Sequence, residues 1–64
     1  REHEILGLLA RGQDVTAIAR ALKLSIYTVR DHVKAILTKL DARSQLEAVV
    51  IAARAGIVLL EPME

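Results

Sequence analysis

The stretch LSIYTVRDHVKAIL, residues 24–37, carries several hydrogen-bonding side chains on one side of a predicted helix. At about 100° per residue, Asp31 and Lys34 fall opposite the apolar positions, and Arg30 lies on one edge of them. A guanidinium or ammonium group can donate to guanine O6 and N7, and a carboxylate can accept from cytosine N4. These three residues are therefore candidates for reading base edges. The competing interpretation is an ordinary solvated helix face.

Asp31 has three open interpretations. Its carboxylate can accept a hydrogen bond from a base, can hold Arg30 or Lys34 in place, or can repel phosphate and so reject wrong sequences. The residue type alone does not choose among them.

A second set of polar residues lies along the same predicted helix and in the turn before it. Hydroxyl groups, ammonium groups and the free backbone N–H groups of a helix N-terminus all bind phosphate oxygens. The candidates for phosphate contacts are Lys23, Ser25, Tyr27, Thr28, Thr38 and Lys39. His32 lies at the border of the apolar stripe, where packing or a phosphate contact fits better than acid–base chemistry.

Four helices are needed to position these residues. Helical periodicity occurs four times, and nothing in the sequence has the alternation or hairpin dipeptides of strands. We expect a single all-α domain over residues 1–64, with helices at about 2–11, 14–22, 25–40 and 44–55. In the third helix, an apolar stripe is predicted to be buried, at Val29, Val33, Ile36 and Leu40.

Capping residues mark the predicted helix boundaries. Favourable N-caps are Asp14, Ser25 and Ser44, the last with Glu47 in a capping box. Only two residues separate the second and third helices, so Lys23 is expected to adopt a left-handed conformation. Gly56 is expected to end the last helix in the same way. Ile57 to Leu60 can then fold back over the core before Pro62 ends regular structure.

The last predicted helix is apolar on two sides. We expect its core face to comprise Leu46, Val49, Val50 and Ala53. The second apolar face is predicted to meet another chain, because a surface helix of a monomer should be polar there. That predicted dimer interface comprises Ala48, Ile51, Ala52 and Ala55.

Charge is segregated along the chain. Residues 20–43 hold six basic and two acidic residues, a net charge of +4, whereas the remaining residues sum to −3. Such an asymmetry orients a molecule toward a polyanion, although a chance distribution over a solvated surface gives the same count.

Several function classes are excluded by composition. The chain has no Cys, which suits a reducing, cytoplasmic setting. Its longest apolar run, AVVIAA, is too short to span a membrane. The sequence contains no nucleophile–base pair, glycine-rich phosphate loop or metal-ligand cluster. We therefore expect no enzyme activity, cofactor, metal or membrane partner.

Two helices joined by a tight turn, the second capped by Ser and polar outward, form a helix-turn-helix pattern. Three segments of the chain then resemble the C-terminal DNA-binding domain of LuxR-type bacterial transcription factors, the family that includes NarL- and FixJ-like response regulators. The segments are REHEILGLLARGQ, IARALKLSIYTVRDHVKAILTKL and RSQLEAVVIAARAGIV, in the family's order and spacing.

This resemblance implies a specific mode of action. The third helix enters the major groove of double-stranded DNA, with Arg30 and Lys34 at base-reading positions, and the fourth helix forms a homodimer. An upstream receiver or sensor domain is expected to regulate binding.

The sequence departs from the family pattern at several positions. DVTA replaces a polar stretch, so that Thr16 stands where a phosphate-binding Lys is usual, and Asp41 replaces a typical Gly. DVTA and Asp31 keep open an alternative, a protein-interaction module that has lost DNA binding. A sigma-factor region shares the first three helices but does not require the last one.

Overall fold

The computed structural model describes residues 1–57, so the expectations for Val58 to Leu60 and for Pro62 lie outside the described residues. Four helices occur in this part of the chain, and it contains no strand: α1 Glu2–Ala10, α2 Val15–Leu22, α3 Ile26–Leu40 and α4 Gln45–Arg54. Each boundary lies within one residue of its predicted position. The all-α, four-helix prediction is confirmed.

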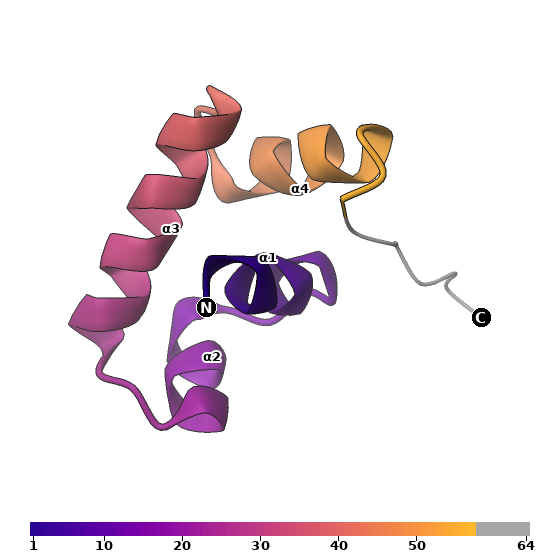
Figure 1. Cartoon of the computed structure of the whole chain (residues 1–64). Coiled ribbons are helices and arrows are strands. Elements are labelled where there is room, and N and C mark those ends of the chain that lie inside the picture. Colours follow the sequence, from indigo (N-terminus) through magenta and orange to yellow (C-terminus); the bar gives the residue numbers. More distant parts are fainter. Residues whose placement is uncertain (58–64) are drawn as a thin grey trace.

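The arrangement leaves one side of α3 uncovered. In Figure 1, α3 runs along one edge of the molecule, and α1, α2 and α4 all lie to the same side of it. Helix α3 contacts each of the other three, and α1 also contacts α2 and α4. Helix α3 is therefore held from one side only, and its outer side faces away from the bundle.

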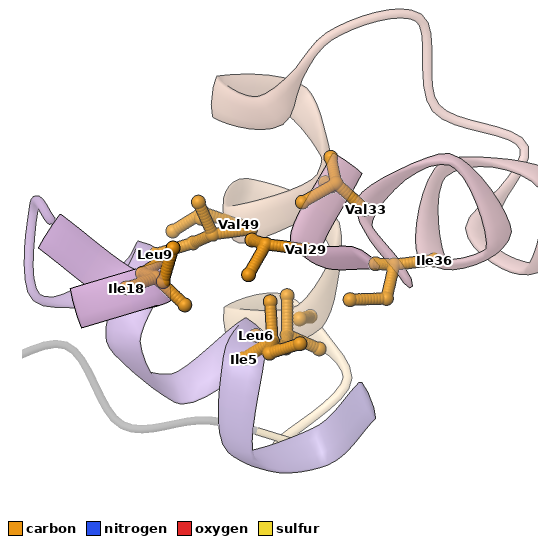
Figure 2. Packing of buried hydrophobic residues seen from close by; sticks show 11 residues of the cluster. Ile5, Leu6, Leu9, Ile18, Val29, Val33, Ile36 and Val49 are labelled. Carbon is orange, nitrogen blue, oxygen red and sulfur yellow. The ribbon is translucent and has the colours of Figure 1, made fainter. Parts of the chain in front are cut away.

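The core is a single aliphatic cluster to which all four helices contribute. Figure 2 shows its side chains meeting between the helices, and Ile5, Ile18 and Val29 are fully buried. None of the described polar or charged residues is buried. From α3 the buried side chains are Val29, Val33 and Ile36, with Leu40 partly buried beside them. The predicted apolar stripe of this helix is confirmed.

The turn between α2 and α3 has the predicted geometry. Lys23 is left-handed, with φ 57° and ψ 42°, and the N–H of Leu24 donates to the carbonyl of Ala19 at 2.9 Å. Asp14 caps α2 by accepting from the N–H of Ala17 at 2.8 Å. Ser25 caps α3 by accepting from the N–H of Thr28 at 3.0 Å. These caps satisfy backbone donors that have no partner within their helices.

The ends of α4 are also capped as predicted, with one difference. Ser44 accepts from the N–H of Glu47 at 3.1 Å, but Glu47 accepts in return from the N–H of Arg43, at 3.3 Å, rather than from Ser44. Gly56 is left-handed, with φ 76°. Asp41, after α3, is left-handed with φ 53°, a conformation that Asp tolerates better than most residues.

The predicted division of α4 into a core face and a dimer face is wrong at four positions. Ala53 packs against the core and Ala55 is exposed, as predicted. Ala48 and Ala52 are fully buried in the core, whereas Leu46 and Val50 are 75% and 38% exposed. Val49 is buried as expected. Because Ala48 and Ala52 have no exposed surface, they cannot form a contact with a second chain. The helix is apolar on both sides, so its sequence pattern does not show which side packs inward.

One long-range ion pair joins the start of α1 to the end of α3. Lys39 Nζ donates to Glu2 Oε1 at 2.7 Å. This hydrogen bond lowers the pKa of the Glu2 carboxyl, against the opposing effect of partial desolvation and with support from the nearby charges of Lys39 and His32. The pair stays in contact with solvent, since the Lys39 and Glu2 side chains are 69% and 33% exposed.

The left-handed backbone at Lys23 predicts a stabilising substitution. Lys23→Gly should raise the free energy of unfolding by about 1 kcal/mol, because Gly adopts this conformation without the Cβ clash. Arg20→Gly is the matched control, since it removes the same charge from a right-handed helical position. It should lower stability by about 1 kcal/mol. Urea unfolding followed by circular dichroism measures both, and equal effects of the two substitutions would contradict the prediction.

A second prediction concerns pH. Because the pKa of Glu2 is lowered in the folded state, its pairing stabilises the fold at neutral pH, and this contribution is lost as the pH falls through the lowered pKa. Lys39→Gln should raise the pKa of Glu2 toward its ordinary value. Lys34→Gln, on the outer side of α3, should leave it unchanged. Carbon-detected NMR titration of the Glu2 carboxyl group distinguishes these outcomes.

Candidate nucleic-acid interface

The three candidate base-reading residues lie together on the outer side of α3. Arg30, Asp31 and Lys34 are all exposed; Asp31 and Lys34 lie opposite the stripe that α3 buries, and Arg30 lies at its edge. Within residues 1–57, none of the three takes part in an ion pair. The interpretation that Asp31 holds Arg30 or Lys34 in place therefore finds no support. Acceptance from a base and repulsion of phosphate remain as the two interpretations of Asp31.

A shallow depression continues this surface toward the end of α3. Its lining residues are Asp31, Lys34, Ala35, Thr38 and Lys39. Two candidate base-reading residues and two candidate phosphate contacts are thus neighbours on one surface. The small Ala35 side chain leaves this part of the helix open to a ligand.

At the start of α3, the hydroxyl groups of Ser25 and Thr28 are hydrogen-bonded to each other and have different roles. Ser25 Oγ accepts from the backbone N–H of Thr28 and donates its own proton to Thr28 Oγ1 at 2.9 Å. The Ser25 proton is therefore used within the cap. Thr28 keeps its hydroxyl proton for an external acceptor such as a phosphate oxygen.

The other candidate phosphate contacts also fall into two groups. Tyr27 is 78% exposed, Lys23 is exposed, and neither side chain has a hydrogen-bond partner among the described residues. Thr38 instead donates its hydroxyl proton to the carbonyl of Lys34 at 3.0 Å, and Lys39 donates to Glu2. Lys23, Tyr27 and Thr28 therefore have donors available at once. Thr38 must first give up its internal acceptor, whereas Lys39 has one of its three N–H donors engaged by Glu2.

The histidines do not form a site together. His3 places Nε2 3.2 Å from the carbonyl oxygen of Ile57, whereas His32 is half-buried on α3. In the part of the chain that the structure describes, no cluster of three or more His, Asp or Glu side chains is arranged to bind a metal. None of the helices described here combines the length and the apolar character needed to cross a bilayer.

Glu2 borders the polar surface of α3 through its contact with Lys39, and the sequence did not predict this role. Its partner Lys39 is 37 positions away, so neither helical periodicity nor a capping pattern connects them. The only sequence signal was an acidic residue in the first turn of α1, which is equally explained by the helix dipole.

Known proteins are similar to this chain both in sequence and in the arrangement of the helices. Residues 1–52 match the family described as "Bacterial regulatory proteins, luxR family". The chain is 40% identical over 58 residues to the response regulator protein VraR of Staphylococcus aureus (strain NCTC 8325 / PS 47), and equally to VraR of Staphylococcus epidermidis (strain ATCC 35984 / DSM 28319 / BCRC 17069 / CCUG 31568 / BM 3577 / RP62A). The match covers 91% of this chain but only 28% of each relative's length.

A solved structure agrees with the sequence comparisons. The structure of transcription factor GerE superimposes with a TM-score of 0.86 at 33% sequence identity, covering 94% of this chain and 90% of that chain. The predicted resemblance is confirmed, and it assigns the helix-turn-helix to DNA binding rather than to enzyme chemistry. The chain belongs to the LuxR family of bacterial regulatory proteins, as a DNA-binding domain of a transcription regulator.

Proposed function

We propose that this chain is the sequence-reading effector domain of a bacterial response regulator, with α3 inserted in the major groove of double-stranded DNA. One observation carries the proposal: Arg30, Asp31 and Lys34 are exposed on α3, and none of them has an ion-pair partner among residues 1–57. An unpaired guanidinium or ammonium group can meet a base edge without first breaking an internal contact.

Phosphate contacts would set the register of α3 on the duplex. Lys23 lies in the turn before α3, and Tyr27 and Thr28 lie in its first turn. Their side-chain donors have no acceptor among the described residues, and the helix dipole there favours an anion. The base-reading residues follow within the next two turns. In this arrangement phosphate contacts give affinity, and Arg30 and Lys34, with Asp31, give sequence preference.

Pairing of two copies would complete the site. We propose that α4 forms the contact, as the resemblance implied, but through Leu46 and Val50 in place of the buried alanines. These two side chains lie one turn apart and are 75% and 38% exposed. Two exposed apolar side chains bury little area, so dimerisation is expected to be weak or to require DNA. Each α3 would then enter one half-site, with half-sites separated by roughly one helical turn of DNA.

The regulatory signal would come from a further domain. The chain spans 28% of the length of the VraR relatives, which are named response regulators. A phosphorylated receiver domain in a two-component system is therefore the proposed upstream partner, in the cytoplasm.

The base-reading proposal predicts a large effect of one double substitution. Arg30→Ala/Lys34→Ala should lose about 1–3 kcal/mol of specific binding for each good base contact removed. Arg54→Ala, an exposed arginine at the end of α4, should bind nearly as the wild type does. The measurement is fluorescence anisotropy on a duplex selected by the wild type from a randomised pool. If neither the wild type nor the double variant binds the duplex at low salt, the domain does not read DNA. The alternative, a protein-interaction module that has lost DNA binding, is then favoured.

The dimer proposal predicts a separable effect. Leu46→Ala/Val50→Ala should weaken binding to a duplex with two half-sites, because the second copy loses its contact with the first. Binding to a single half-site should stay unchanged and serves as the internal control. Sedimentation that shows a tight wild-type dimer without DNA would contradict the expected weakness of this interface.

A further inference from the structure

The ion pair between Glu2 and Lys39 lies at the border of the proposed DNA-binding surface. Lys39 Nζ is 2.7 Å from Glu2 Oε1, yet the lysine side chain remains 69% exposed. Its ammonium group is therefore held by one internal partner while most of the side chain stays accessible to an external ligand.

Lys39 lines two depressions, one on each side of its position in α3. On the α1 side, the depression is also lined by Glu2, His3, Leu6, Ile36 and Leu40. On the outer side, Lys39 shares a depression with Asp31, Lys34, Ala35 and Thr38. A lysine ammonium group sits on a flexible four-carbon chain. From one backbone position, it can turn toward Glu2 or toward a phosphate beside the outer side of α3.

We propose that Glu2 is a positioning residue that holds Lys39 on the α1 side of α3, and that a DNA phosphate competes with Glu2 for this lysine. The inference rests on the proposed function of α3. Exposed ion pairs are weak and are screened by salt, whereas a phosphate contact also releases condensed counterions. The exchange of partners is therefore reversible, and Glu2 limits the number of phosphate contacts and the affinity of the domain for DNA.

The chain supplies a matched control for this role. Glu4 carries the same charge on the same helix, but it pairs with Arg1 at 3.1 Å and not with α3. Removal of the Glu4 charge changes the overall charge of the domain by the same amount as removal of the Glu2 charge. Only the Glu2 substitution frees Lys39.

The test is a double-substitution cycle with Glu2→Gln and Lys39→Gln, and with Glu4→Gln as the control. Each variant is titrated by anisotropy against a labelled duplex of mixed sequence over a series of salt concentrations. Glu2→Gln should bind about two- to fivefold more tightly at low salt, the range that an exposed ion pair can account for. Its salt dependence should steepen by about one phosphate contact. Glu4→Gln should change affinity less, and Glu2→Gln should give no gain when Lys39→Gln is also present.

Three results would overturn the inference. These are equal or weaker binding by Glu2→Gln, equal gains from Glu2→Gln and Glu4→Gln, and a gain that persists in the Lys39→Gln background. A wild type without salt-dependent DNA binding would overturn the proposed function as well. A wild type that binds while Glu2→Gln behaves identically overturns only the role of Glu2.

A measurement on the unaltered protein removes any dependence on how the variants fold. Addition of the duplex should raise the pKa of Glu2, because the hydrogen bond from Lys39 that lowers it is lost. A pKa that stays the same on DNA binding would show that Lys39 keeps its partner and would also overturn the proposal.

Discussion

The burial of one stripe of α3 against the other three helices is the constraint on which the rest of the structure depends. Val29, Val33 and Ile36 are at most 5% exposed, and full burial of such a side chain stabilises a fold by about 1.5–3 kcal/mol. These contacts fix the rotation of α3 about its axis. Arg30 and Lys34 then point outward as a consequence of core packing, so the core determines which residues a DNA duplex can meet.

The turn before α3 links the fold and the proposed function through the same atoms. The left-handed backbone at Lys23 and the cap at Ser25 decide where α3 begins. The cap also consumes the Ser25 hydroxyl proton and leaves that of Thr28 free. The cap that satisfies the backbone N–H donors therefore also determines which hydroxyl group can donate to a phosphate.

The ion pair at the other end of α3 is of a different kind. Exposed pairs contribute little to stability because they are screened by solvent, so the contact between Glu2 and Lys39 adds little to a fold that its aliphatic core already holds together. Its importance lies in the position of the negative charge of Glu2. It brings an acidic residue of α1 to the edge of the basic segment and so joins the packing of α1 on α3 to the electrostatics of the outer side.

The sequence by itself determined the four helices, their caps, the left-handed Lys23 and Gly56, and the rotation of α3, because each signal lies within a few neighbouring residues. Only the tertiary structure decided which side of α4 is buried. That helix is apolar on two sides, and its packing on α1 and α3 encloses Ala48 and Ala52 while leaving Leu46 outside. Likewise, only the tertiary structure paired Lys39 with Glu2. Contacts between distant segments depend on how whole helices pack, and no local pattern carries that information.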